Sequence, residues 1–209
     1  MKGILGLLRH KTQPEPGADK LDSLLFTTAF AGQGVDASLL VPWEARAVEV
    51  GAKRLNPAVG IKLLQDLWTK DRYTSHLESA AIQRMGRFFD FATVPANRDI
   101  IRQDEYGNFM VVLLKGNIAV DRLQPWGERL RLAETRPGEI LGEMSLLDSG
   151  IRFSACTTLG ECDVAVLSAE GMDEMLTAEP GLAANLIAVL ARKLSLRLRV
   201  VSARLSDKK

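Results

Sequence analysis

The sequence predicts an α+β protein, in which an antiparallel β-roll of double-stranded, jelly-roll-like form lies between a helical N-terminal extension and a long C-terminal helix. Apolar residues recur at helical spacing from about residue 38 to residue 89. From residue 91 to residue 167, short β-like runs divided by turn residues replace that pattern. Residues 182–205 are again periodic and long enough for one helix of about 36 Å.

Composition excludes several classes of protein. Charged residues make up 25% and hydrophobic residues 46% of the 209 residues, and the net charge is +1. The longest apolar run, Phe109–Leu114, is far shorter than the ~20 residues that cross a bilayer. Two cysteines and two histidines do not make a disulfide framework or a zinc module. We therefore expect a reduced, cytoplasmic protein with no transmembrane segment, no metal site and no cofactor.

The chain divides into three predicted parts: a flexible segment or linker over residues 1–36, a helical extension over 37–73, and the β-roll with its terminal helix over 74–209. The start, Met1–Lys11, is a frayed terminus or a weak membrane-surface or partner helix. Thr12–Asp22 contains two prolines and a glycine and is typical of a linker.

Within the helical region, Ile61, Leu64, Leu67 and Trp68 form one apolar stripe. Ser75–Glu78 has the pattern of a capping box, which predicts that a helix begins there. We expect Trp43 to anchor the core.

The β-roll is predicted from short runs rich in Val, Ile, Leu and Phe and separated by Gly, Pro and Asn. The predicted strands are Phe91–Val94, Asp99–Arg102, Phe109–Leu114, Asn117–Arg122, Arg129–Glu134, Phe153–Leu159 and Asp163–Leu167. A short helix is expected over Ser168–Thr177, and Pro180-Gly181 separates it from the long helix, Leu182–Leu205.

Residues that could bind a ligand are concentrated between Gly138 and Ala155. Gly142 leaves room for a ligand to approach the backbone, and the short helix after it points free N–H groups toward that place. Arg152 is a planar cation suited to phosphate oxygens. Glu143 is an acid beside this anion site, which makes sense when its carboxylate accepts hydrogen bonds from sugar hydroxyls. Together these residues indicate a sugar-phosphate pocket.

The segment Gly142-Glu143-Met-Ser-Leu-Leu, followed by Arg152 and then Ser154-Ala155, resembles the phosphate-binding cassette of cyclic-nucleotide-binding domains. That family includes the catabolite activator protein and the regulatory subunits of cAMP-dependent kinases. The resemblance extends over roughly Ser75–Leu205.

The resemblance implies a role for each matching residue. Glu143, beside Gly142, would bind the ribose 2′-hydroxyl, and Arg152 would bind the exocyclic phosphate oxygens. Backbone N–H groups of three further residues would complete the phosphate site: Met144, Phe153 and Ser154. On the terminal helix, Lys193 and Arg197 would reach the base.

Three positions depart from the family pattern. Ile151 stands where the family has proline and Phe153 where it has a small residue, so the ring either narrows the pocket or points into the core. Arg197 stands where the catabolite activator protein has a hydroxyl residue, and an arginine suits a guanine edge or a stacked base at least as well as adenine. Both cAMP and cGMP therefore remain candidate ligands.

Two structural alternatives stay open at this point. Arg152 could instead form an ion pair with Glu143 in an empty or repurposed pocket. The basic residues of the terminal helix could bind DNA, but the helix dipole also favours cationic side chains near its C-terminus. Only Ser206–Lys209 follow that helix, too few for a DNA-binding helix-turn-helix, so we expect no DNA contact.

We therefore expect a regulatory protein that senses a cyclic nucleotide and signals through an unidentified protein partner. Apolar residues along Leu182–Leu205 predict a homodimer through this helix. No catalytic residues are expected, because the sequence contains none of the common nucleophile, P-loop or metalloprotease motifs. The alternative is a scaffold or interaction module that keeps the β-roll without a nucleotide.

Overall fold

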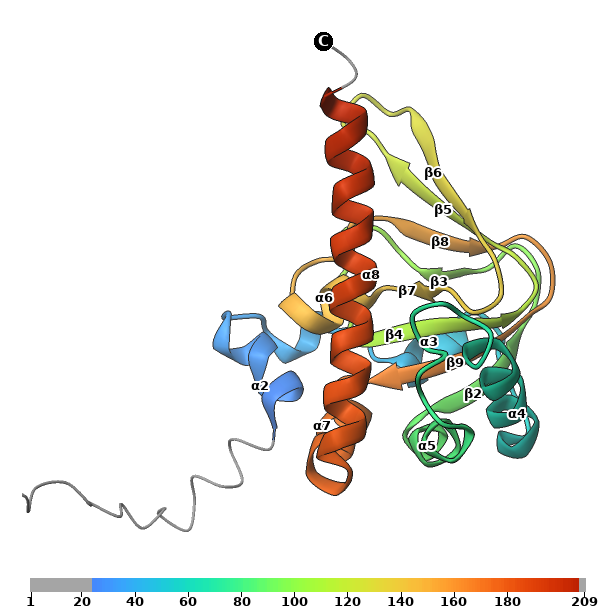
Figure 1. Ribbon diagram of the computed structural model, residues 1–209. Helices are drawn as coiled ribbons and strands as arrows, with labels where there is room; N and C mark the ends of the chain where they lie inside the picture. The colour runs from blue at the N-terminus through green and yellow to red at the C-terminus, as the bar shows by residue number, and fades with distance from the viewer. Residues whose placement is uncertain (1–23, 207–209) are drawn as a thin grey trace, which may run out of the picture.

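A computed structural model describes residues 24–206 and shows two antiparallel sheets packed face to face, with helices against one of them (Figure 1). One sheet has the strand order β1-β2-β9-β4-β7 and the other β3-β8-β5-β6. The strands are β1 (Lys53–Arg54), β2 (Asp90–Val94), β3 (Asp99–Ile101), β4 (Phe109–Lys115), β5 (Ile118–Leu123), β6 (Arg129–Thr135), β7 (Ile140–Leu141), β8 (Ala155–Thr158) and β9 (Cys162–Ser168). The predicted α+β class and antiparallel β-roll are confirmed.

The helices flank this roll in the predicted order. They are α2 (Leu25–Gly32), the 3₁₀ helix η1 (Ala37–Leu39), α3 (Trp43–Glu49), α4 (Pro57–Trp68), α5 (Ser79–Met85), the 3₁₀ helix η2 (Gly86–Phe88), α6 (Glu143–Asp148), α7 (Ala169–Ala178) and α8 (Pro180–Ser206). The seven predicted strands are present with small shifts at their ends. The strands β1 and β7 were not predicted, because two residues are too few to show an alternating pattern.

Strand β4 lies at the centre of the fold because both of its faces are buried. Met110, Val112 and Leu114 pack into a core that the helices share. Phe109, Val111 and Leu113 pack into a second core between the two sheets. A strand covered on both sides has no polar face, which explains the uninterrupted apolar run of the sequence. Trp43 joins the second core and meets the Phe109 ring edge-on at 5.6 Å, as predicted.

Helix α2 lies inside the segment that the sequence predicted as a linker, so that prediction is wrong for residues 25–32. Buried Asp173 on α7 stabilises the start of α2. Its carboxylate accepts hydrogen bonds from the backbone N–H groups of Phe26 and Thr27 at 2.8 and 2.9 Å. A cap supplied from 146 residues away is invisible to local sequence patterns. The predictions for Met1–Lys11 and Thr12–Asp22 lie outside the described residues.

The predicted capping box at Ser75–Glu78 is also wrong. These residues belong to a turn region, and α5 begins only at Ser79, after Glu78, with no side chain capping it. Other polar groups hold the turn instead: Asp71 accepts the N–H of Tyr73 at 2.8 Å, and the Thr74 hydroxyl donates to the Trp68 carbonyl at 2.6 Å.

The long helix α8 has two different halves. Near its start, Leu186 and Leu190 are fully buried against the roll. Beyond residue 195 its apolar side chains are largely exposed, and this half runs past the strands β5 and β6 (Figure 1). Among residues 24–206, no helix combines the length and apolar character that crossing a bilayer requires.

The contact between α4 and β2 depends on a glycine. A Cβ at Gly60 would lie 2.1 Å from Cδ1 of the buried Phe91 ring. We predict that Gly60→Ala lowers the free energy of unfolding by about 1–3 kcal/mol, measured by urea denaturation, because the ring has nowhere to move. Gly181→Ala, in the first turn of α8 with open space around it, should leave stability unchanged or raise it by up to about 1 kcal/mol. Equal stability of the two variants would contradict this interpretation.

Candidate functional site

Residues 142–154, here called the cassette, form one wall of a cavity of about 770 Å³. The cassette contributes Gly142, Glu143, Met144, Ser145, Arg152, Phe153 and Ser154 to the lining, and α8 contributes Leu196, Arg197, Val200 and Val201. Strands of both sheets supply further lining residues, among them Ile101, Val120, Leu132, Leu141 and Cys156. The structure therefore brings together every predicted ligand-binding residue except Lys193.

Gly142 begins the cassette in a conformation that suits only glycine. Its φ is +74°, and a Cβ there would lie 2.6 Å from Nη1 of Arg152 and 2.7 Å from Cδ1 of Ile101. Gly142 stands at the N-cap of α6 and has no side chain to accept the N–H groups of the first helical turn. Within the described residues, no backbone hydrogen bond uses the N–H groups of Phe153 or Ser154.

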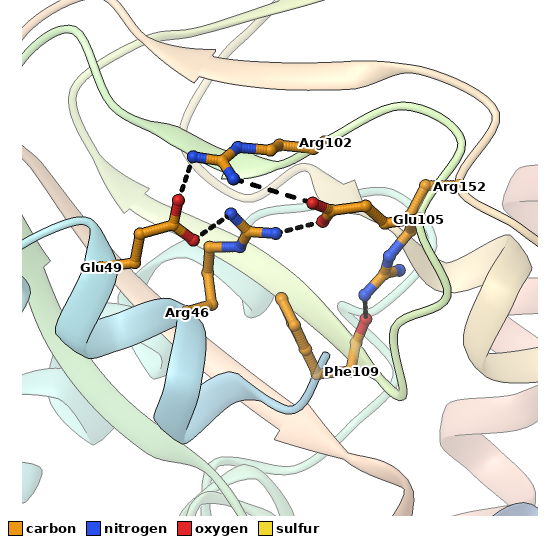
Figure 2. A network of polar contacts seen from close by, with 6 residues as sticks. All are labelled: Arg46, Glu49, Arg102, Glu105, Phe109 and Arg152. Carbon is orange, nitrogen blue, oxygen red and sulfur yellow. Dashed lines mark hydrogen bonds and ion pairs between the residues drawn. The ribbon is translucent and has the colours of Figure 1, made fainter. Parts of the chain in front are cut away.

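Arg152 is buried, with 3% of its surface exposed. It donates from Nη1 to the Gly142 carbonyl at 2.7 Å and from Nη2 to the Phe109 carbonyl at 2.6 Å, and its guanidinium lies 4.6 Å from the centre of the Phe109 ring (Figure 2). Burial lowers the pKa of Arg152 to about 10, so the side chain remains a cation at neutral pH. The guanidinium can therefore supply positive charge to an anion in the cavity.

Glu143 pairs with Arg197 of α8, not with Arg152 as the structural alternative supposed. Arg197 also donates to the Ile140 carbonyl at 2.9 Å. This arginine therefore connects α8 both to β7, through Ile140, and to the cassette, through Glu143. Burial raises the pKa of Glu143, and the charge of Arg197 opposes that rise. The ion pair is the direct polar link between the cassette and the terminal helix.

Lys193 lies elsewhere, although it is only one turn away from Arg197. Its Nζ is 3.2 Å from Oδ2 of Asp71 and 5.9 Å from the centre of the Tyr73 ring. Burial would raise the pKa of Asp71, but hydrogen bonding by Tyr73 N–H and the charge of Lys193 outweigh it, and the net pKa is lowered. Lys193 thus ties α8 to the turn before α5, a placement that gives it no contact with the cavity.

Phe153 neither points into the core nor blocks the cavity. Its side chain is half exposed, and the guanidinium of Arg122 lies 4.1 Å from the ring centre. The same arginine donates to the Phe153 carbonyl. The bulky residue is therefore held at the edge of the cavity.

Sequence reasoning missed the apolar part of the lining. Leu196, Val200 and Val201 belong to α8, whose apolar residues were interpreted as a core and partner stripe. Leu132 lies on β6, where every residue but the last is exposed. Spacing along each element could not show that the two meet across one cavity, because that depends on where α8 crosses the roll.

Comparisons with known proteins agree with this geometry. Residues 91–179 match the family model of the cyclic nucleotide-binding domain. The chain is 31% identical over 107 residues to the cyclic AMP receptor protein of Thermus thermophilus, covering 51% of this chain and 50% of that protein. It is 25% identical over 118 residues to a CRP-like cAMP-activated global transcriptional regulator of Mycobacterium tuberculosis, covering 56% and 53%.

Solved structures show the same fold. A cyclic nucleotide-binding domain from Methylobacillus flagellatus superposes with a TM-score of 0.64 at 19% identity, covering 76% of this chain and 89% of that one. The Thermus thermophilus catabolite activator protein gives a TM-score of 0.55 at 27% identity, with 63% of each chain covered. The chain spans about half the length of the curated relatives it matches. Over residues 91–179, this chain is similar to the cyclic nucleotide-binding domain family.

Proposed function

We propose that this protein is a regulator that binds a cyclic nucleotide, cAMP or cGMP, in the cavity between the cassette and α8. The observation that carries the proposal is that Arg152, Glu143 and the cassette residues Phe153 and Ser154, whose N–H groups make no backbone hydrogen bond, line one wall of that cavity. A volume of about 770 Å³ lies within the usual range for small-molecule sites.

The phosphate would lie against Arg152. Two hydrogen bonds to carbonyls fix its guanidinium and leave further N–H donors for phosphate oxygens. The N–H groups of Met144, Phe153 and Ser154 would supply additional donors around the anion. This arrangement supports the roles that the family resemblance implies for these residues.

The ribose would compete with α8 for Glu143. In the structure the Glu143 carboxylate accepts a hydrogen bond from Arg197. A 2′-hydroxyl at the same carboxylate changes the environment of that pair, and with it the position of α8. Ligand binding would thereby reach the helix that a partner can sense.

The base would meet Arg197 together with the apolar side chains of α8 and β6. Arg197 can hydrogen-bond a guanine edge or stack on a purine, so both nucleotides fit the proposal. Because Lys193 is paired with Asp71, we assign it no contact with the base.

The protein would signal through a protein partner and would form a homodimer through α8. In the distal half of α8, Leu198 and Leu205 form a short apolar stripe, are seven residues apart and are more than half exposed. Such a stripe pairs well with a second copy of the same helix. We propose that the protein acts in the cytoplasm without catalysing a reaction, in line with relatives that are named as receptors and regulators.

Isothermal titration calorimetry with cAMP, cGMP and a cyclic dinucleotide tests the binding proposal. We expect one of the two mononucleotides to bind, and Arg152→Ala to weaken that binding by about 30- to 150-fold, the loss of roughly 2–3 kcal/mol of charge-assisted hydrogen bonds.

Arg131→Ala is the matched control for this variant, because it removes an arginine that pairs with Asp121 outside the cavity lining. It should bind like the wild type. Absence of binding near 1 mM ligand would favour the alternative, a scaffold with an empty or repurposed pocket. Unchanged affinity in a folded Arg152→Ala protein would show that the ligand binds elsewhere.

The raised pKa of Glu143 predicts a pH effect on stability. A carboxyl group whose pKa is raised by folding holds its proton more tightly in the folded state, so its stabilising contribution is present at low pH and is lost as pH rises through the folded pKa. The difference in unfolding free energy between Glu143→Gln and the wild type should therefore move in favour of the variant as pH rises above about 4, the ordinary pKa of a glutamate. Urea denaturation at several pH values measures this difference, and the opposite slope would contradict the burial argument.

The proposed dimer can be tested by sedimentation velocity. A double variant, Leu198→Glu with Leu205→Glu, should convert a dimer to a monomer at micromolar concentration, because the glutamates of the two copies would face each other across the helix pair. Val48→Glu, at an 84% exposed position on α3, should leave the association unchanged. A wild-type protein that sediments as a monomer would rule out this interface.

A further inference from the structure

A ring of four charged side chains joins the N-terminal extension to the β-roll. Arg46 on α3 pairs with Glu49 at 2.6 Å and with Glu105, and Arg102 pairs with the same two carboxylates (Figure 2). The Arg46 side chain is 2% exposed, whereas Glu49, Glu105 and Arg102 keep between 30% and 46%. Arg46 is thus the buried centre of the ring.

We infer that Arg46 is a positioning residue for the proposed phosphate site, acting through Glu105 on Arg152. This inference rests on the proposed function. A buried guanidinium is costly unless it is paired, and a surface role would not require burial. Arg46 holds the Glu105 side chain through its carboxylate, and the backbone of Glu105 in turn contacts Arg152.

The backbone around Glu105 is hydrogen-bonded to the cassette. The carbonyl of Glu105 accepts the N–H of Arg152 at 2.8 Å, and the N–H of Asp104 donates to the Arg152 carbonyl at 2.9 Å. The next residue, Tyr106, forms an antiparallel bridge with Ile151. The backbone of Arg152 is therefore fixed by the loop that Arg46 holds.

The extension contacts the same loop a second time through its backbone. Val41 donates its N–H to the Tyr106 carbonyl at 2.9 Å, and Leu40 forms a parallel bridge with Tyr106. Residues 40–41, 105–106 and 151–152 thus lie side by side, joined by these backbone contacts. A displacement of the extension would be passed to Arg152 through this arrangement.

The side chain of Arg152 tolerates little displacement. It lies between two glycines, where a Cβ at Gly107 would be 2.7 Å from its Nη2 and one at Gly142 would be 2.6 Å from its Nη1. Gly107 follows directly after the loop that carries Glu105. If that loop moved, Gly107 would move with it, and the space between Gly107 and Gly142 that holds the Arg152 guanidinium would change.

Ligand affinity in a double-mutant cycle tests this coupling. We expect Arg46→Met and Glu105→Gln each to weaken binding of cAMP or cGMP by about 10-fold in calorimetry, and the double variant to bind no more weakly than Arg46→Met. Glu49→Gln neutralises the other carboxylate that pairs with the same arginine but leaves the loop contact, so its affinity should stay within about twofold of the wild type. Wild-type affinity in Arg46→Met, or losses that multiply in the double variant, would overturn the inference.

Amide hydrogen exchange of the ligand-free protein provides a readout that does not depend on binding. In Arg46→Met the N–H groups of Arg152 and Asp104 should exchange at least about 10-fold faster, while the amides of β4 and β9 keep their protection. Faster exchange throughout the molecule would indicate general destabilisation and would overturn the positioning role.

The two readouts also separate this inference from the proposed function. If no cyclic nucleotide binds the wild type while the two amides respond as expected, the proposed function fails but Arg46 still positions the Arg152 backbone. If nucleotide binds and neither readout changes in Arg46→Met, the binding proposal stands and the positioning role is wrong.

Discussion

The burial of one cation, the guanidinium of Arg152, constrains much of the surrounding structure. Taking a charged group out of water is favourable only when hydrogen bonds and nearby charges replace the solvent. Two backbone carbonyls and the face of Phe109 supply part of that replacement. The slot that holds the side chain requires glycine on both sides, at positions 107 and 142. Strand β4, the loop before it and the cassette must all keep their places for this slot to exist.

The protein groups that contact Arg152 balance its charge incompletely. Its hydrogen-bond partners are neutral carbonyls, and the carboxylate that the cassette offers, Glu143, is paired with Arg197. Burial accordingly lowers the pKa of Arg152. An anion in the cavity would restore the balance, because it brings negative charge to a site of low polarizability where such interactions are strong. The same desolvation that destabilises the free protein therefore favours binding.

Sequence reasoning succeeded where the relevant residues are close together along the chain. Gly142, Glu143, Arg152 and Ser154 fall within one short segment, and the structure places them on one cavity wall. The strand pattern succeeded for the same reason, since alternation is a local property. Reasoning failed at contacts between distant segments: Asp173 caps α2, and Asp71 takes Lys193 away from the cavity. Neither partner is visible from spacing, because each depends on how α7 and α8 pack.

Two groups of contacts hold the cassette: those of Arg152 with the loop that the extension contacts, and those of Glu143 with α8. Any ligand that changes the free energy of the Glu143–Arg197 contact or of the Arg152–Glu105 contact also changes how firmly α8 or residues 40–50 are attached. Coupling of this kind is reciprocal, so a partner that binds either element must change ligand affinity by the same factor by which the ligand changes partner affinity. The exposed half of α8 and the charged ring of the extension are separate surfaces. A single binding event in the cavity would thereby affect two different surfaces, with opposite sign if one contact tightens as the other is released.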